Sequence, residues 1–135
     1  MAITQYVLFT VLSAELPANL FLQTLRQARA RHMALAITGA MLFDGEAALC
    51  LIQGEPDALG QARLALTQGL PSTVWQALHQ GAVQGERLFK DWRVGYTEPE
   101  AVLSLCGSWG DVADESAQAR PLTAFERLVN ASDPL

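Results

Sequence analysis

The stretch that most constrains the fold is an apolar segment from Ile37 to Gly54, with the sequence ITGAMLFDGEAALCLIQG. Two runs rich in apolar residues, Ile37–Phe43 and Ala47–Gln53, flank the tripeptide DGE. Asp-Gly between two such runs is typical of a tight turn that joins antiparallel strands. The pattern therefore predicts a hairpin, and Cys50 lies in its second strand, at a position that turns toward the interior.

The segments around this hairpin alternate between strand and helix patterns. Residues 3–12, ITQYVLFTVL, are rich in β-branched and aromatic types and predict a buried strand. Apolar residues recur at helical spacing over 18–33, and a second helix is expected over 54–69, with proline at its start and glycine at its end. A weaker strand is expected within 72–83 and a last one at 93–97. The order β-α-β-β-α-β-β predicts a ferredoxin-like α+β sandwich, with two helices on one face of a mixed sheet.

The amino-acid composition of the chain changes after residue 98. The following residues are small and polar around a few apolar anchors, and LTAFERLVNAS, residues 122–132, predicts a short helix. We interpret residues 1–98 as the core and 99–135 as a helical cap on the open face of the sheet. Both parts belong to one domain, since 135 residues is an ordinary length for a single domain.

The composition excludes several classes of function. Half of the residues are hydrophobic and 17% are charged, which is typical of a globular protein. The net charge of -5 argues against nucleic acid or an anionic membrane as a partner. The apolar runs are too short to span a bilayer, and the N-terminus has no signal-peptide pattern. We expect a cytoplasmic protein.

The chain also lacks the patterns of common metal and catalytic sites. Cys50 and Cys106 are far apart, no CxxC occurs, and His32 and His79 do not complete a ligand cluster. A zinc site or a disulfide framework is therefore not expected. No P-loop, HExxH or nucleophile-elbow motif occurs, so we do not expect an enzyme.

Two motifs resemble those of BLUF domains, the blue-light sensors that use flavin. In ITGAMLFDGEAALCLIQG, the ITG of the family stands intact at Ile37, Thr38 and Gly39, while IQG replaces the family's LEG. RLFKDWRVG is similar to the family's R-x-F-x-x-W-x-M segment, with valine in place of methionine. The resemblance covers roughly residues 3–98. Short members of the family carry two C-terminal helices packed on the sheet.

The resemblance implies a light-driven mechanism. In the family, an isoalloxazine ring lies between the two helices, and a tyrosine on the first strand donates an electron and a proton to it. A glutamine on the third strand connects tyrosine and flavin by hydrogen bonds. An asparagine at the end of the first helix holds the polar edge of the ring.

In this chain all three positions carry other residues. The tyrosine position is Leu8, the asparagine position is His32 and the glutamine position is Cys50. Leucine has no hydroxyl, and a thiol is only a weak hydrogen-bonding group. The imidazole of His32 retains a nitrogen that could donate to a flavin oxygen. Each lost partner of a buried polar group costs about 1–3 kcal/mol, so flavin binding should be strongly weakened.

The substitutions at Leu8 and Cys50 both lower polarity, which suggests that the flavin slot has become protein core. Met33 and Met41 lie nearby in sequence and are suited to filling irregular gaps. Tyr6 shares the strand face of Leu8, but it is displaced by one strand repeat of about 6–7 Å, so we do not expect it to replace the tyrosine. We therefore expect no cofactor, with FAD as the cofactor if the family role is retained.

Three functional hypotheses follow. The first is a BLUF-like signalling or regulatory module without flavin, which acts through a protein partner or a homo-oligomer. The second is an FAD-binding photoreceptor with atypical flavin contacts. The third is a small-molecule or thiol redox sensor that reuses the slot, with Cys50 as its reactive group.

Several residues have two interpretations at this point. Cys50 is a reactive thiol or a small buried hydrophobic residue. His32 is a relic of ligand binding or a pH-sensitive group, or else a histidine at a helix C-terminus that complements the helix dipole. Trp92 lies near a cofactor or anchors the core under the C-terminal cap. Trp75 and Trp109 are exposed anchors for a partner or ordinary packing residues.

Overall fold

The computed structural model describes residues 3–12, 14, 16–69, 75–83, 85–110 and 119–134. The predicted order β-α-β-β-α-β-β is confirmed and continues into two more helices and a two-residue strand. The elements are β1 (Thr4–Val11), α1 (Ala18–Ala34), β2 (Thr38–Phe43), β3 (Ala47–Gly54), α2 (Pro56–Gly69), β4 (Gln76–Ala82), β5 (Trp92–Tyr96), α3 (Ala101–Gly110), α4 (Ala119–Ala131) and β6 (Asp133–Pro134).

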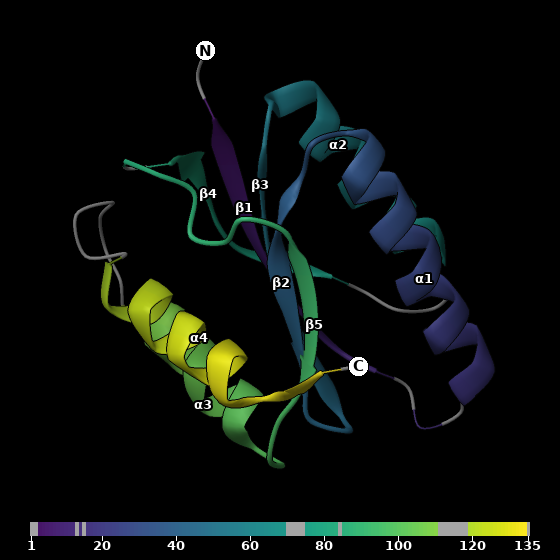
Figure 1. Ribbon diagram of the computed structural model, residues 1–135. Coiled ribbons are helices and arrows are strands. Elements are labelled where there is room, and N and C mark those ends of the chain that lie inside the picture. The colour runs from purple at the N-terminus through teal and green to yellow at the C-terminus, as the bar shows by residue number, and fades with distance from the viewer. Residues whose placement is uncertain are drawn as a thin grey trace.

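One mixed sheet forms the centre of the molecule, with strand order β4-β1-β3-β2-β5-β6. The pair β2–β5 is parallel and the other pairs are antiparallel. Helices α1 and α2 cover one face of the sheet, and α3 and α4 lie on the other (Figure 1). The predicted mixed sheet with two helices on one face is thus confirmed.

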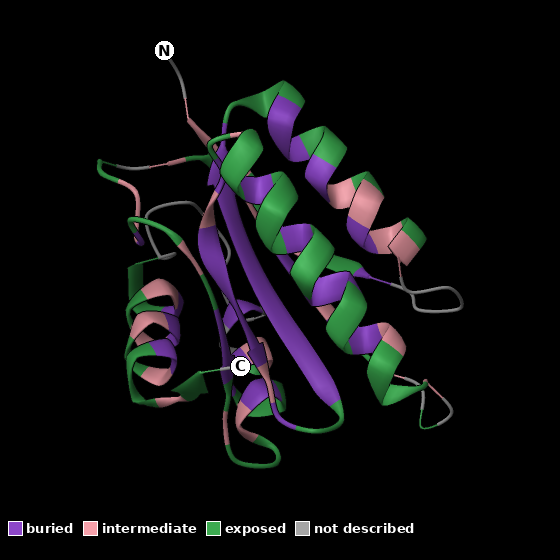
Figure 2. Ribbon diagram, turned by 45° about the vertical axis from the view of Figure 1, so that its right-hand side comes forward, coloured by how far each residue is buried: buried purple, intermediate pink, exposed green. Residues whose placement is uncertain are grey.

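Side chains that alternate along the strands build two separate cores. On the α1/α2 side, Leu8, Met41 and Cys50 pack with apolar residues of both helices. On the α3/α4 side, Val7 and Leu49 pack with residues such as Phe125. Because it lies between the two layers, β3 has all eight of its residues buried, and the inner strands are largely buried in Figure 2.

The predicted hairpin is present, and two local features fix its geometry. Asp44 Oδ1 accepts hydrogen bonds from the backbone N–H groups of Glu46 and Ala47, at 3.0 and 2.8 Å. Gly39 has a φ of +144°, and a Cβ at this position would collide with the carbonyl oxygen of Leu51. The glycine of ITG is therefore required by close strand packing.

The C-terminal segment begins with a helix, α3, that composition alone did not delimit. The helix predicted over 122–132 begins earlier, at Ala119. Part of the polar stretch, residues 111–118, lies outside the described residues. Among the described residues, no helix is long and apolar enough to cross a membrane. The boundary at residue 98 stays a prediction.

Candidate functional site

The structure brings two of the three predicted site residues together. Leu8 on β1 lies directly opposite Cys50 on β3, and Met41 on β2 flanks Cys50 on its other side. All three side chains are completely buried. His32 lies in the last turn of α1 and is also buried. The face expected to line a flavin slot is therefore the interior of the α1/α2 core.

The space between α1 and α2, here called the interhelical space, is nearly filled. Its cavity has a volume of about 10 Å³. A single water molecule needs roughly 10–15 Å³, so the cavity holds at most one water. Its walls come from one face of each helix: Thr24, Gln27, Ala28, Arg31, His32, Ala62, Ala65 and Leu66.

One polar contact ties the two helices together across this space. The Oγ1 hydroxyl of Thr24 on α1 lies 3.0 Å from the carbonyl oxygen of Gly69 on α2 and 2.9 Å from that of Leu20. A Cβ on Gly69 would lie 2.8 Å from Thr24 Cγ2, closer than real side chains approach. Close helix approach at this end thus depends on the glycine.

His32 is a neutral aromatic side chain in this environment. Its ring meets the indole of Trp92 edge to face, with centroids 4.3 Å apart, and its buried Nδ1 has no partner within the described residues. Burial, reinforced by the neighbouring charge of Arg31, lowers the pKa of His32 to about 4. The interpretation of His32 as a cation that complements the helix dipole is therefore wrong, since the ring is uncharged at neutral pH.

Cys50 has the properties of a core residue. Its side chain is completely buried, and burial raises the pKa of its thiol far above the usual range. The thiolate is the reactive form of cysteine, so the native environment suppresses nucleophilic and redox chemistry at this position. Cys106 on α3 is partly exposed and is also a free thiol.

These residues do not fit a flavin ring as they stand. The interhelical space has room for at most one water, and Leu8 offers no hydrogen bond at the tyrosine position. At these positions, the Nδ1 of His32 is a buried nitrogen that has no hydrogen-bond partner within the described residues. Met41 helps to fill this core as predicted, but Met33 is 80% exposed, so its predicted filling role is wrong.

The three tryptophans pack differently from some of the sequence interpretations. Trp92 lies on the α1/α2 side of the sheet, so its interpretation as an anchor under the C-terminal cap is wrong. Trp75 and Trp109 are both buried, in the α1/α2 core and the α3/α4 core respectively. Neither of them is an exposed anchor.

A polar cluster that the sequence did not reveal secures the segment before β5. The Nε2 amide of Gln53 donates to Gln5 Oε1 at 2.8 Å, and the backbone N–H of Leu88 donates to Gln53 Oε1 at 2.8 Å. Arg87 donates to the carbonyl oxygen of Ala36 at 2.7 Å and to that of Gln53 at 3.3 Å. The arginine of the R-x-F-x-x-W motif therefore has a structural role here, as it joins loop backbone to the ends of β2 and β3.

A second and much larger hollow lies along β5, and we call it the edge groove. It has a volume of about 1060 Å³ and runs from the end of α1 past residues 86–94 to the end of α4. His32 and Trp92 line one part of it, while Arg87, Lys90 and Arg93 line another. The only sequence signal for this groove was the spacing of these three cations, every third residue.

This architecture was compared with those of known proteins. No family model and no curated protein matches the chain. Among solved structures, the BLUF protein BlrB in its dark state matches with a TM-score of 0.65 over 93% of this chain and 96% of that one, at 17% identity. The chain has the fold of a BLUF domain. BlsA in its photo-activated state matches over 97% of both chains, with a TM-score of 0.62 and 14% identity.

The same BLUF fold also occurs within a longer protein. Klebsiella pneumoniae BlrP1, solved with FMN and cyclic diGMP, matches with a TM-score of 0.62 and 20% identity. The match covers 93% of this chain but only 34% of BlrP1. The resemblance drawn from the ITG and R-x-F-x-x-W segments is thus confirmed for the fold.

Proposed function

We propose that this protein is a signalling or regulatory module of BLUF fold that works without flavin and acts through contacts with another protein. The observation that carries this proposal is the packed α1/α2 core: Leu8 and Cys50 are cross-strand neighbours with completely buried side chains, and the cavity between the two helices measures only about 10 Å³. The module is not an enzyme in this proposal, and its place is the cytoplasm.

The substitutions remove the chemistry that the family resemblance implies. Leu8 provides neither an electron nor a proton, since its side chain carries no redox-active or ionisable group. The Cys50 thiol stays protonated and cannot bridge two hydrogen-bonding partners as a carboxamide does. A ring placed here would face apolar side chains with its polar edge largely unpaired, which is costly in a dry interior.

The similar structures support a role in signalling. BlrB and BlsA are matched over nearly the whole length of their solved chains. In BlrP1 the matched part is about one third of a larger protein. In both arrangements the BLUF fold has to influence another polypeptide or domain, and this supports output through protein contacts.

One observation favours a second candidate, an FAD-binding photoreceptor with atypical contacts. His32 occupies the position that holds the ring edge in the family, and its buried Nδ1 has no partner in the part of the chain that the structure describes. A bound ligand would supply one. This candidate requires α1 and α2 to separate, which breaks the contact between Thr24 and Gly69.

An absorption spectrum tests the two candidates. The protein is purified, incubated with excess FAD, freed of unbound flavin and measured before and after blue light. The proposal expects a colourless protein with no light-induced change. Stoichiometric bound flavin with a red shift after illumination would overturn it and establish the photoreceptor, whereas bound flavin without a shift would overturn the loss of flavin alone.

A further inference from the structure

The strand β5 has one side bonded to β2 and one side that faces outward. At the start of β5 the backbone N–H of Gly39 donates to the carbonyl oxygen of Asp91 at 3.0 Å, and after its end Thr97 N–H donates to Phe43 O at 2.9 Å. In a parallel pair, alternate residues bond to the neighbouring strand. The odd-numbered residues of β5 therefore face β2, and the even-numbered residues direct their N–H and C=O groups to the outer edge.

The outer edge is only partly covered. The short strand β6 pairs with Gly95 and Tyr96. Among the described residues, no strand pairs with the edge at Trp92 and Val94. Unpaired backbone groups in a row are a template for another strand, and proteins usually cover or shorten such edges.

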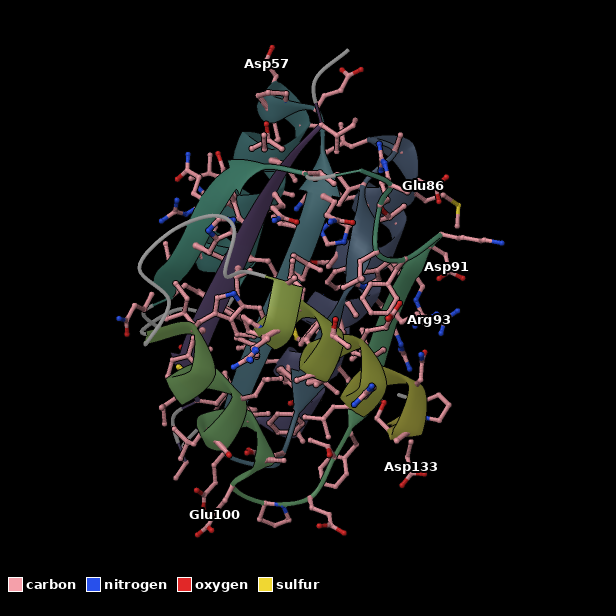
Figure 3. All side chains as sticks on the ribbon, turned by 90° about the vertical axis from the view of Figure 1, so that its left-hand side faces the viewer. Asp57, Glu86, Asp91, Arg93, Glu100 and Asp133 are labelled. Carbon is pink, nitrogen blue, oxygen red and sulfur yellow. The ribbon has the colours of Figure 1, made fainter. Side chains whose placement is uncertain are left out.

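The edge groove that follows this open stretch concentrates positive charge in an acidic chain. Figure 3 shows Glu86, Asp91 and Arg93 following one another along the β5 edge. Of the ten carboxylate residues in the part of the chain that the structure describes, two line the groove, Glu86 and Asp91. Four of the nine cationic residues line it: Arg29, Arg87, Lys90 and Arg93.

Part of this charge is not compensated by a neighbouring carboxylate. Arg87 donates hydrogen bonds to two carbonyl oxygens and to the Thr38 hydroxyl, all of them neutral acceptors. Arg93 is paired with Asp91 at 3.1 Å, but both side chains are about half exposed or more. Lys90 is exposed. The groove therefore attracts anionic groups.

The groove also offers an apolar contact next to the strand edge, because Met33, 80% exposed, lies on its α1 side. The Nε1 of Trp92 and the Nδ1 of His32 have no partner within the described residues, but both atoms are buried, so they are not counted among the contacts of a bound peptide. An extended peptide places side chains alternately on its two faces, so one face can contact Met33 while the other meets the cations.

From these features we infer that the edge groove binds an extended, acidic segment of a partner protein, which adds to the sheet as a strand beside Trp92 and Val94. This inference rests on the proposed function, because it names the chemistry of the partner through which the module acts. Main-chain hydrogen bonds provide part of the affinity, and carboxylates of the segment meet Lys90, Arg93 and Arg87.

The charges favour this occupant over a second copy of the chain. Two β5 edges that paired around a twofold axis would place the same cations opposite each other, which is unfavourable. A nucleic acid would satisfy the cations through its phosphates but would leave the strand edge at Trp92 and Val94 unused. The combination of open backbone and positive charge therefore fits an acidic strand best.

Synthetic peptides test the inference on the full chain. The probe is a fluorescent eight-residue peptide of alternating valine and glutamate. One control carries lysine in place of glutamate, and another carries N-methyl groups on alternate backbone nitrogens of the same acidic sequence. Binding is measured by fluorescence anisotropy, and backbone amide spectra locate the site.

The expected result is that the acidic peptide binds and shifts the amide signals of Trp92 and Val94 and the indole N–H signal of Trp92. The lysine and N-methyl peptides bind about tenfold more weakly or worse, which corresponds to about 1.4 kcal/mol. Lys90→Glu combined with Arg93→Glu weakens the acidic peptide by a similar factor. Arg26→Glu combined with Arg120→Glu changes the net charge equally at exposed residues outside the groove, and it leaves binding nearly unchanged.

Three outcomes would overturn the inference: equal binding of the acidic and lysine peptides, equal loss with both charge-reversal pairs, or a single-stranded oligonucleotide that outcompetes the peptide at the same amides. Failure here is distinct from failure of the proposed function. If the protein is colourless but binds no acidic peptide, only the assignment of the edge groove is overturned. If the protein binds flavin and also binds the peptide, only the proposal of a flavin-free module is overturned.

Discussion

Two hollows of this molecule share His32 as a wall, and they differ in nearly every physical respect. The interhelical space measures about 10 Å³ and belongs to a core in which Leu8 and Cys50 are completely buried. The edge groove measures about 1060 Å³ and is lined by cations, carboxylates and an open strand edge. The first has the residues of packed protein, and the second has those of a binding surface.

If the proposed function holds, the difference illustrates how a BLUF fold can keep its framework while its binding surface changes place. Apolar substitutions at the interior positions allow the core to close, because dry side chains pack where polar ones would need partners. The edge of β5 belongs to the other hollow, and its outer side at Trp92 and Val94 has no strand partner among the described residues. On these proposals, the interhelical space contributes stability and the edge groove contributes recognition.

The largest contrast is expected in thiol reactivity. Cys50 should react with a thiol reagent only after the protein opens, because its thiol is buried and kept protonated. Labelling of Cys50 in a Cys106→Ser variant should be about 1,000-fold or more slower than in denaturant. The Cys50→Ser variant reports Cys106, which is partly exposed and should label far sooner. Rapid native labelling of Cys50 would mean that the interhelical space is open.

The packing of the two regions can be compared by truncating one side chain in each and measuring the change in the free energy of unfolding. Leu8→Ala leaves a void in a closed core and should lower the free energy of unfolding by about 2–5 kcal/mol. Met33→Ala, in the edge groove, should change it by about 0.5 kcal/mol or less, because that side chain is already exposed. Urea denaturation measures both. Similar costs for the two variants would contradict a filled interhelical space.

The shared wall, His32, should make stability depend on pH. Its pKa is about 4 in the folded protein, against 6.5 for an ordinary histidine. Between these values the unfolded chain binds more protons, so the free energy of unfolding falls as the pH falls, by roughly 2 kcal/mol between about pH 7.5 and pH 5. Near pH 4 and below, the folded protein binds the proton as well, and the loss from this residue levels off.

A His32→Phe variant provides the control for this pH dependence. Phenylalanine keeps an aromatic contact with Trp92 but does not titrate, so the variant should retain more of its stability at the lower pH. All other titratable groups are common to the two proteins, so their effects cancel in the comparison. Parallel pH dependences of the two proteins would show that His32 is not buried as a neutral ring.

The last prediction concerns the stability provided by the contact that holds α1 and α2 together. Gly69→Ala should cost about 1–3 kcal/mol, because the added methyl would lie 2.8 Å from Thr24 Cγ2. In a Thr24→Ser background that methyl group is gone while the hydroxyl remains, so the same change at Gly69 should cost little or stabilise slightly. Denaturation of the four proteins completes the cycle, and an unchanged cost in the serine background would refute the close approach of α1 and α2.

The sequence was sufficient for the framework because its signals are local. Asp44 and Gly45 define the hairpin turn, and the helical spacing after Ala18 defines α1. The ITG glycine was recognised as a motif, although its cause, the collision of a Cβ with Leu51 O, required the sheet. The short strand β6 could not be predicted, since two residues carry no periodicity.

The candidate site was predictable only in part. Leu8 and Cys50 were expected to share a dry interior, and the register of β1 and β3 places them opposite each other. The neutral state of His32 depends on tertiary burial, which its position near a helix end does not reveal. The structural roles of Gln53 and Arg87 arise from contacts across more than 30 residues of sequence, beyond any local pattern.

The most direct test of the closed interhelical space is a calorimetric titration of the purified protein with FAD, in the dark. We predict no saturable heat and no flavin retained by the protein afterwards. One-to-one binding that is lost when Ala62 in the cavity wall is replaced by tryptophan, in a variant that still folds, would contradict the account.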